Sequence, residues 1–354
     1  MHGMDSGASF LRSATAPAPV TSRFASLPAS LCSILGLGHY LPSRVLTNDE
    51  LALTVDTSDQ WIVERTGIRG RHCAAPNEAT SDMARLAALR ALEDAQLAPS
   101  DLDLILFATS TPDTPVPSTA CHLQAALGCS GVPAMDINAG CAGFGYAMQL
   151  AASSIRGGLH QRVLVIGADT LTRITNYADR QSCILFGDGA GAAVVGARGR
   201  YDVIYSEIGA DGTGADLIRV PAGGSRTPAS LESVTTAGHT LELHGREVFK
   251  AAVLRMAECL RRAAKGVGVQ PSDFDVVIPH QANARIIEAV GRQLDIGPER
   301  LVVDIGETGN TASASIPIAL ERARGGLRPG QLVAVVGFGA GLAWACQVLL
   351  VREM

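Results

Sequence analysis

DINAGCAGFGYAMQLA, residues 136–151, places a cysteine between an apolar strand and a helix rich in small residues. The strand is expected over 132–137, and Cys141 follows it at the start of the helix. Unpaired backbone N–H groups and the positive end of the helix dipole favour thiolate over thiol there, so we expect Cys141 to be a nucleophile with a lowered pKa. The small residues Gly140 and Gly143 leave room for a bulky substrate. The alternative is a buried structural cysteine, which is the commoner role for an isolated cysteine.

The chain repeats the pattern around this cysteine. Each of three pairs of segments contains an apolar strand, and the partners lie about 170 residues apart. The pairs are 99–110 with 271–282, 135–151 with 303–320, and 162–170 with 331–341. Helices are expected before the first pair, over 81–97 and 247–266, because apolar residues recur there at helical spacing. Chance matching of apolar strands is the alternative, and the ordered series argues against it.

Strands this apolar that alternate with helices indicate an α/β protein with mostly parallel sheets covered on both faces. We therefore predict two similar halves, over about 31–200 and 201–354. Residues 1–30 are expected to form a flexible extension. Their richness in Ala, Ser, Pro and Thr is similar to that of an organelle transit peptide, but no basic segment precedes a continuous apolar core as in a secretory signal.

Composition excludes several classes of protein. Apolar residues make up 47% and charged residues 18% of the 354, which is typical of a compact enzyme. The net charge of −5 gives no indication of nucleic-acid binding, and no apolar run is long enough for a membrane helix. The eight cysteines are scattered without metal-ligand spacing, so we expect reduced thiols, no bound metal and a cytoplasmic location.

Six further segments, taken in order, resemble the 3-oxoacyl-[acyl-carrier-protein] synthase III family of thiolase-fold condensing enzymes. They are SDQWIVERTGIRGRH (58–72), NAGCAGF (138–144), ILFGDGAGAAVV (184–195), GREVFK (245–250), PHQANARII (279–287) and GNTASASIP (309–317). The resemblance runs from about Ser33 to the C-terminus. It implies a thiolase-like fold of two pseudo-symmetric halves in a five-layered αβαβα arrangement.

The resemblance also implies a Cys-His-Asn catalytic set, which maps onto Cys141, His280 and Asn310. A thiolate takes the acyl group from a thioester, and two neutral donors then stabilise the enolate that forms when a malonyl thioester loses CO2. A lone histidine at a strand end is usually a satisfied structural residue, and a lone asparagine after glycine usually forms a turn or cap. These readings are less favoured here because all three residues follow strands at matching ends of the repeat.

Further roles follow from the resemblance alone. Gly339, Ala340 and Gly341 would form an oxyanion loop with the Cys141 N–H. Coenzyme A would be bound by Trp61, Arg65, Arg180, Gly245 and Asn283, and an acidic carrier protein would dock on Lys250, Arg285 and Arg292. Core packing is the alternative for Trp61, and ordinary surface arginines would give the same docking pattern. The substrates would be an acyl-CoA and a malonyl-carrier protein, with no metal or redox cofactor, and the enzyme would be a homodimer with contacts in 112–128.

The sequence departs from the family pattern at several positions. Val116 stands where some relatives carry a phenylalanine that shortens the partner subunit's acyl pocket, so a longer or branched primer is a hypothesis here. Ala340 replaces a usual glycine, and a positive φ at that position would disturb the loop. GDGAG (187–191) lacks the residues of a phosphate loop and is expected to be a tight turn between two strands.

Rival functions predict other sequence features. A cysteine hydrolase would carry a different local motif at its cysteine and no internal repeat. A biosynthetic thiolase would have a second catalytic cysteine in the last glycine-rich loop, and GFGAG (337–341) has none. A thiolase-fold acyltransferase or starter-unit enzyme of a secondary-metabolite pathway remains the alternative to initiation of fatty-acid synthesis.

Overall fold

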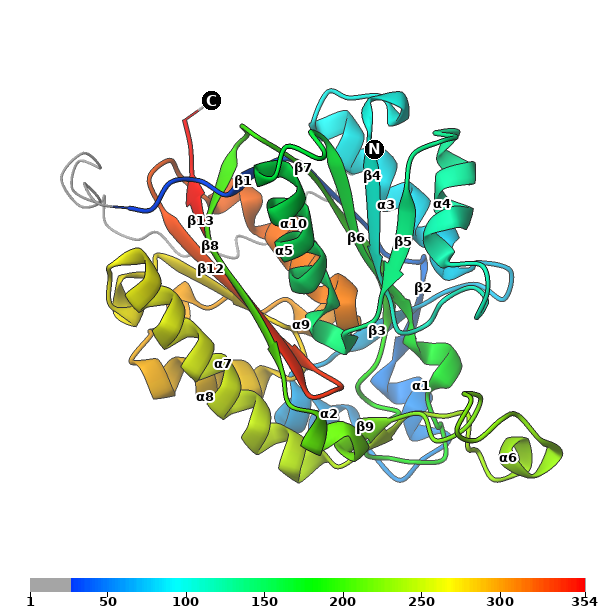
Figure 1. The fold of residues 1–354 in the computed structure, drawn as a ribbon. Helices are drawn as coiled ribbons and strands as arrows, with labels where there is room; N and C mark the ends of the chain where they lie inside the picture. The colour runs from blue at the N-terminus through cyan, green and yellow to red at the C-terminus, as the bar shows by residue number, and fades with distance from the viewer. Residues whose placement is uncertain (1–26, 354) are drawn as a thin grey trace, which may run out of the picture.

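The structure is a computed structural model that describes residues 27–353, so most of the predicted extension over 1–30 lies outside the described residues (Figure 1). The first part of the chain forms β1 (Cys32–Tyr40), α3 (Thr80–Asp94), β4 (Leu104–Ala108), α4 (Thr119–Leu127), β5 (Ala134–Ile137), α5 (Gly143–Arg156), β6 (Val163–Thr170) and β7 (Asp188–Gly196). The helix expected over 81–97 is α3, and the strand before Cys141 is β5.

The second part gives elements in the same order. They are β8 (Tyr201–Ala210), α7 (Gly245–Val267), β11 (Val276–Pro279), α8 (Ala284–Leu294), α10 (Ser315–Ala323), β12 (Leu332–Gly339) and β13 (Ala343–Val351). The counterpart of β5 is a single bridge in which Leu301 pairs in parallel with Val277. The exact boundary between the two predicted halves stays a prediction.

Shorter elements are inserted into each part. β2 (Arg44–Thr47), α1 (Asn48–Ala52), α2 (Asp59–Thr66) and β3 (Gly70–Cys73) follow β1. β9 (Ile218–Arg219), α6 (Leu231–Thr235) and β10 (Glu242–Leu243) precede α7, and α9 (Ile305–Thr308) precedes α10. α2 and β9 lie at the lower end of the molecule in Figure 1, below the main sheet, and β10 pairs with β9.

Within residues 27–353, nine strands form one sheet in the order β11-β12-β13-β8-β1-β7-β6-β4-β5. β4 is parallel to β5 and β6, and β11 is parallel to β12, but all other neighbours are antiparallel. The prediction of mostly parallel pairing is therefore wrong. A continuous apolar run indicates that a strand is covered on both faces, but it does not indicate the direction of the neighbouring strands. β7 and β12 are both fully buried although each has at least one antiparallel neighbour.

The two parts of the sheet meet where β1 pairs with β8 over only three residues, Cys32–Ile34. α5 and α10 lie between the two parts, and their Phe144 and Ile316 share one apolar core with residues of both. α3 and α4 cover the outer face of the first part, and α7 and α8 cover the outer face of the second. The predicted five-layered αβαβα arrangement is confirmed (Figure 1).

The small residues of α5 have a packing cause. A Cβ atom on Gly145 would lie 2.4 Å from the Cβ of Ala345 in β13, so the helix can approach the sheet only because this side chain is absent. Close packing fixes the start of α5, where Cys141 lies, against the second part of the sheet.

The expectation for GDGAG is wrong. Asp188 opens β7, and the following glycines continue that strand instead of forming a turn. The Asp188 carboxylate accepts hydrogen bonds from Thr172 and from the backbone N–H of Ala74, so it ties the strand to two neighbouring segments.

Candidate active site

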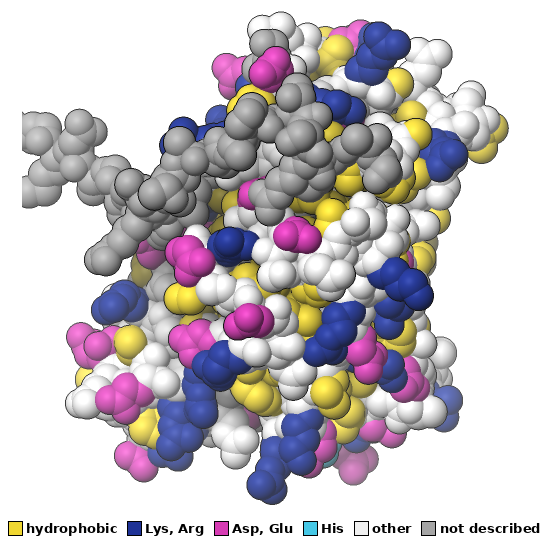
Figure 2. Space-filling model, turned by 90° about the vertical axis from the view of Figure 1, so that its left-hand side faces the viewer, with side chains coloured by type: hydrophobic (Ala, Val, Ile, Leu, Met, Phe, Trp, Pro, Cys, Tyr) yellow, Lys and Arg dark blue, Asp and Glu magenta, His cyan; other side chains and the backbone are white. Residues whose placement is uncertain are grey.

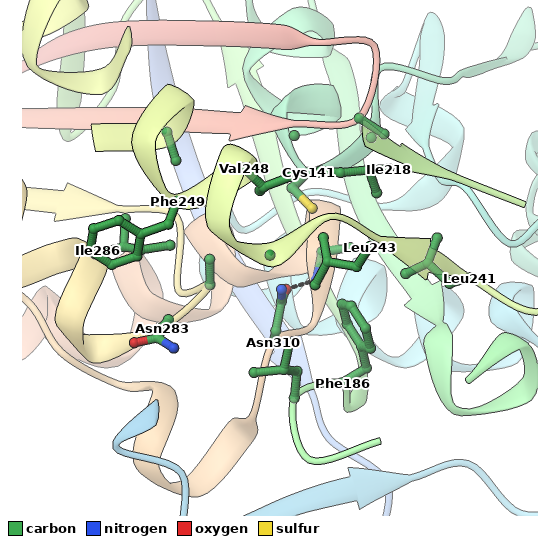
Figure 3. Close-up of a pocket in the computed structure, with 18 of the residues that line it drawn as sticks. Cys141, Phe186, Ile218, Leu241, Leu243, Val248, Phe249, Asn283, Ile286 and Asn310 are labelled. Atoms are coloured by element: carbon green, nitrogen blue, oxygen red, sulfur yellow. Dashed lines mark hydrogen bonds between the residues drawn. The ribbon is translucent and has the colours of Figure 1, made fainter. Parts of the chain in front are cut away.

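A cavity of about 1260 Å³ opens at the end of the sheet where β11, β12 and the stretch after β5 terminate. Its lining comes from both parts of the chain and includes Cys141, His280 and Asn310. Figure 3 shows the sulfur of Cys141 and the amide of Asn310 pointing into this space, among apolar side chains such as Phe186 and Leu241. A few polar groups that converge in a largely apolar cavity are typical of a site that binds and transforms a small molecule.

Cys141 lies in a short 3₁₀ turn, Gly140–Ala142, that leads directly into α5. Gly140 adopts a φ of 52°, and a Cβ there would lie 2.7 Å from the backbone nitrogen of Ala340. The turn therefore brings the loop after β12 against the cysteine. The thiol is partly accessible from the cavity.

The expected lowering of the Cys141 pKa is wrong. Burial of the thiol, with a smaller contribution from the charge of Asp169, raises the pKa of Cys141 to about 12. Desolvation disfavours a buried thiolate by more than the helix start favours it. Cys141 therefore rests as a neutral thiol near pH 7 and has to lose its proton as it attacks.

His280 directly follows β11, and its ring is only 2% exposed. Its Nδ1 lies 2.6 Å from the hydroxyl oxygen of Ser315 at the start of α10. Burial lowers the pKa of His280 from 6.5 to about 3, so the ring is neutral throughout the physiological range. Because Nδ1 is engaged, Nε2 is the ring nitrogen left for the cavity.

Asn310 is held by its backbone and by its own side chain. Its N–H donates to the Leu185 carbonyl at 2.9 Å, and its carbonyl accepts from the Gly187 N–H at 3.0 Å. The side-chain Oδ1 accepts from the Ala312 N–H at 2.9 Å. The amide Nδ2 is therefore the group of Asn310 that is left to donate, and Asn310 is both a turn residue and a candidate donor.

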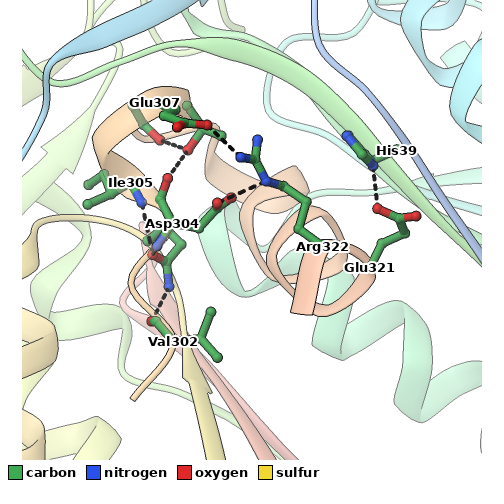
Figure 4. A network of polar contacts seen from close by, with 10 residues as sticks. His39, Val302, Asp304, Ile305, Glu307, Glu321 and Arg322 are labelled. Atoms are coloured by element: carbon green, nitrogen blue, oxygen red, sulfur yellow. Dashed lines mark hydrogen bonds and ion pairs between the residues drawn. The ribbon is translucent and has the colours of Figure 1, made fainter. Parts of the chain in front are cut away.

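One buried side chain connects the segments that carry His280 and Asn310. Gln281 accepts from the N–H groups of Asp304 and Ile305 at 2.7 and 3.2 Å and donates to the carbonyl of Val302 at 3.1 Å. Arg322 of α10 pairs with the Asp304 carboxylate at 3.0 Å (Figure 4). Burial raises the pKa of Asp304 to about 6. This network fixes the path from the end of β11 to α9 and onward to Asn310.

The predicted oxyanion loop packs directly against Cys141. A Cβ on Gly339 would lie 2.4 Å from the Cys141 nitrogen, so no larger residue fits there without displacing the cysteine. Gly341 adopts a φ of 140°, whereas Ala340 is not among the described residues with positive φ. The concern about Ala340 therefore does not apply to this loop, and the position that needs glycine for its backbone is 341.

The predicted coenzyme A residues gather at the cavity mouth. The guanidinium carbons of Arg180 and Arg65 lie 4.7 and 5.6 Å from the centre of the Trp61 ring. Arg180 also donates to the backbone carbonyl of Asp56 at 2.8 Å. An aromatic face flanked by two cations suits a nucleotide with its phosphates.

Gly245 and Asn283 also line the cavity, at the starts of α7 and α8. The Asn283 oxygen accepts from the Arg285 N–H at 2.9 Å, and its Nδ2 donates to the Arg65 carbonyl at 3.2 Å. Asn283 is therefore a helix cap that also joins α8 to the end of α2.

The three predicted docking residues are not equivalent. Lys250 and Arg285 are exposed and lie at the cavity lining, but Arg292 does not line it and faces Glu288 at 3.6 Å. Figure 2 shows the side that lies to the left in Figure 1, over α7 and α8. Lys and Arg are frequent in its lower part, with Asp and Glu among them. Any docking surface here is therefore mixed in charge.

Val116 does not reach the cavity of its own chain. It is 84% exposed in the loop before α4 and is absent from the cavity lining. β5, close to this loop in the sequence, is an edge strand of the sheet, and its Met135 is 46% exposed.

Several residues of the site were not predicted from the sequence. Ser315 and Gln281 lie in segments that were singled out, but the Ser315–His280 contact spans 35 positions, and the hydrogen bonds of Gln281 to Val302 and to the start of α9 span 21 to 24. Asp169, fully buried at the end of β6, accepts from Ser313 at 2.5 Å and from the Ser110 N–H at 2.7 Å. A single aspartate in an apolar strand gives no indication in the sequence that it will accept hydrogen bonds from two other segments of the site.

The described residues offer neither a metal-ligand cluster nor a membrane-spanning helix. Within 27–353, no set of three or more His, Cys, Asp or Glu side chains is placed to hold a metal ion. No helix in this range is both long and apolar enough to cross a membrane.

Comparisons of the sequence and of the structure with known proteins point to one family. The family model described as 3-Oxoacyl-[acyl-carrier-protein (ACP)] synthase III matches residues 135–212, and the model of its C-terminal part matches 264–351. The beta-ketoacyl-[acyl-carrier-protein] synthase III of Caldanaerobacter subterraneus subsp. tengcongensis is 49% identical over 319 residues, which are 89% of this chain and 96% of that protein.

Solved structures agree with this. The 3-oxoacyl-[acyl-carrier-protein] synthase III from Aquifex aeolicus VF5 superposes with a TM-score of 0.83 at 43% identity, over 90% of this chain and 99% of that one. The priming beta-ketosynthase of the R1128 polyketide biosynthetic pathway has a TM-score of 0.84 at 34% identity, over 94% and 99% of the two chains.

Proposed function

Because this chain belongs to the beta-ketoacyl-[acyl-carrier-protein] synthase III family, we propose that Cys141, His280 and Asn310 carry out that family's reaction in the cavity described above. The enzyme is an acyltransferase that initiates fatty-acid synthesis: it condenses an acyl-CoA with malonyl-[acyl-carrier-protein] to give 3-oxoacyl-[acyl-carrier-protein], CoA and CO2. The observation that carries the residue assignment is the convergence of one thiol and two neutral hydrogen-bond donors in one apolar cavity.

In the first step the Cys141 sulfur attacks the thioester carbonyl of the acyl-CoA. A carbon–sulfur bond forms to Cys141, the bond to the CoA sulfur breaks, and the thiol proton ends on the CoA that leaves. The raised pKa of Cys141 means that sulfur attack and proton loss are linked. The Cys141 N–H and an N–H of the loop 339–341, which packs against Cys141, would bind the oxyanion of the tetrahedral intermediate.

In the second step the malonyl thioester loses CO2, and the electron pair of the broken carbon–carbon bond moves into an enolate. The charge develops on the thioester oxygen, where Nε2 of His280 and Nδ2 of Asn310 donate hydrogen bonds. A neutral histidine suits this role, since an imidazolium would tend to protonate the enolate before it reacts. The carbanion then attacks the acyl-Cys141 carbonyl, and the cysteine sulfur leaves as a thiolate that takes up one proton from solvent.

We propose that CoA binds at the mouth of the cavity. The nucleotide of CoA would lie at Trp61, Arg65 and Arg180, and the pantetheine arm would pass Gly245 and Asn283. For carrier docking the lining position favours Lys250 and Arg285, and Arg292 is the weaker candidate. No electron transfer occurs, so we propose that two thioester substrates suffice, without a metal or redox cofactor, and that the enzyme works in the cytoplasm.

A homodimer is part of the proposal. The edge strand β5 and the exposed Val116 and Met135 would meet a second copy of the chain. Val116 would then reach the partner's acyl site, where its small side chain would admit longer or branched primers. Val116→Phe should shorten the longest primer accepted, and an unchanged preference would contradict this role.

Intact-protein mass spectrometry tests the proposal. The enzyme is incubated with acetyl-, octanoyl- and branched acyl-CoAs and then chased with malonyl-carrier protein. One acyl adduct on Cys141 that disappears as 3-oxoacyl-carrier protein forms is the expected result. An adduct that survives this chase but moves to another acceptor would favour the starter-unit acyltransferase, and the absence of any adduct would contradict the assignment of Cys141.

A further inference from the structure

A serine that is not part of the Cys-His-Asn set lies against the one ring nitrogen of His280 that faces away from the cavity. Ser315 is the first residue of α10, and both it and His280 are 2% exposed. The Ser315 Oγ lies 2.6 Å from Nδ1 of His280, and the Gln281 N–H donates to the same oxygen at 3.4 Å. The contact crosses from the end of β11 to the segment that carries Asn310.

The direction of this hydrogen bond follows from the donors available. A serine hydroxyl has one hydrogen and accepts up to two hydrogen bonds. If Nδ1 carried the ring proton, Ser315 would accept from both His280 and Gln281, and its own hydrogen would have no acceptor among the described residues. Leaving a buried donor unpaired costs more than the hydrogen bond gains. If Ser315 donates to Nδ1, its hydroxyl hydrogen, Nδ1 and the Gln281 N–H are all paired, and Nε2 alone is left for the cavity.

The direction of this hydrogen bond decides which ring nitrogen of His280 carries the proton. Because His280 is neutral near pH 7, one of its two nitrogens carries the proton and the other does not. A hydroxyl that donates to Nδ1 leaves the proton on Nε2, the nitrogen available to the cavity. In the opposite tautomer Nε2 would present a lone pair to the enolate oxygen and would repel it.

We propose that Ser315 is a positioning residue that fixes His280 in the Nε2-protonated tautomer and thereby makes it a hydrogen-bond donor to the malonyl-derived enolate. The role of His280 as a donor to the enolate rests on the proposed function, whereas the assignment of its tautomer does not depend on that function. Ser315 acts through His280 and does not touch the substrate.

The test combines spectroscopy with two half-reactions. The full-length protein is labelled with [¹⁵N]histidine, and the signals of His280 are identified by their loss in H280Q. In the wild-type protein Nε2 should be protonated and Nδ1 unprotonated. In S315A the two ¹⁵N signals should move toward the other tautomer or toward averaged values, and CO2 release from malonyl-carrier protein should fall roughly 10- to 100-fold. Acylation of the neighbouring cysteine should change much less, which also shows that S315A is folded.

Two variants serve as controls. S313A removes a hydroxyl that is equally buried two residues away but bonds Asp169 and the Ala108 carbonyl, so the His280 signals should stay in place. S315T keeps the hydroxyl and should restore the wild-type tautomer.

Two results would overturn the proposal: a wild-type His280 with its proton on Nδ1, or S315A with unchanged His280 signals. The wild-type spectrum decides the first of these even if S315A fails to fold. A wild-type protein with the expected tautomer that released no CO2 would contradict the proposed function instead, because the assignment of Ser315 does not depend on that measurement.

Discussion

The two halves of the repeat use the same place in the fold for different chemistry. After β5, two residues lead to the turn Gly140–Ala142 that holds Cys141, and α5 follows directly. At the matching place in the second half, the chain passes through α9 to Asn310 before α10 begins, and His280 follows the strand β11. One half therefore supplies a nucleophile and the other supplies two neutral donors. The repeat fixes where side chains converge, and the residue at each junction decides what the site does there.

Electrostatic conditions are similar at Cys141 and His280, although His280 follows β11, the counterpart of β4, and not the segment that matches β5. Burial raises the pKa of Cys141 and lowers the pKa of His280, so both groups are neutral at rest. Separate junctions for the two tasks imply that acyl transfer to the enzyme and decarboxylation of malonyl-carrier protein are separable by mutation. The following predictions test this separation.

Removal of the nucleophile should have the largest effect. Cys141→Ala should abolish the acyl adduct and lower the condensation rate roughly 10⁴-fold or more, since the covalent route is lost. Mass spectrometry and product formation measure both effects. Cys73→Ser, in β3 and outside the cavity lining, is the matched control and should keep the adduct. An adduct that persists in Cys141→Ala would place the nucleophile elsewhere.

Removal of either donor should act on the second half-reaction. His280→Ala and Asn310→Ala should each lower CO2 release from malonyl-carrier protein about 100- to 1,000-fold, because one enolate hydrogen bond is lost. His160→Ala is the control, since its ring bonds Ser154 and does not line the cavity. Rates of decarboxylation equal to wild type in both donor variants would contradict the division of tasks.

A change in the loop against Cys141 should act on the first half-reaction. Gly339→Ala would place a methyl group 2.4 Å from the Cys141 nitrogen, and the resulting displacement should slow acylation by about 100-fold. Gly325→Ala is the control, because nothing lies within 4 Å of a Cβ at that position. Quenched-flow assays measure the rate of acylation in both variants, and thermal unfolding shows whether each variant is folded. Normal acylation in Gly339→Ala would show that the loop adapts.

The pH dependence of alkylation tests the resting state of the thiol. With the pKa of Cys141 near 12, the thiolate fraction should rise about tenfold per pH unit through the neutral range. The rate of iodoacetamide alkylation at Cys141, followed by mass spectrometry, should therefore rise between pH 6 and pH 9 without a plateau. A plateau below pH 8 would mean that the helix start lowers the pKa of Cys141 by more than burial raises it.

A change at the cavity mouth should have the smallest effect. Trp61→Ala removes the aromatic face next to Arg180 and should raise the KM for acyl-CoA about tenfold. An acyl-pantetheine substrate, which lacks the nucleotide, provides the control, and its KM should not change. Equal effects on both substrates would indicate that Trp61 serves core packing.

The three predicted catalytic residues line one cavity, and the sequence indicates this for two of them: His280 directly follows β11, and Cys141 lies in a short turn between β5 and a helix rich in small residues, whereas Asn310 follows α9 and no strand. It does not predict the pKa of Cys141, since that depends on packing by segments far away in the chain, including Asp169 at the end of β6. The contact between Ser315 and His280 also forms only after folding.

Two other differences have equally physical causes. An apolar strand looks the same in the sequence whether its neighbours are parallel or antiparallel, so the direction of β7 was not predictable. The position of Arg292 on α8 matches a docking pattern, but the side chain lies outside the cavity lining and beside Glu288. Which turn of an exposed helix faces a cavity depends on how that helix packs.

A single-turnover experiment tests the central claim most directly. Wild-type enzyme and His280→Ala are loaded with labelled acetyl-CoA, freed of excess substrate and mixed with malonyl-carrier protein. Both proteins should carry the acetyl group on Cys141, but only the wild type should release CO2 and transfer the label to product within the first turnover. A His280→Ala variant that fails to load yet still releases CO2 would contradict the division of the reaction between the two halves.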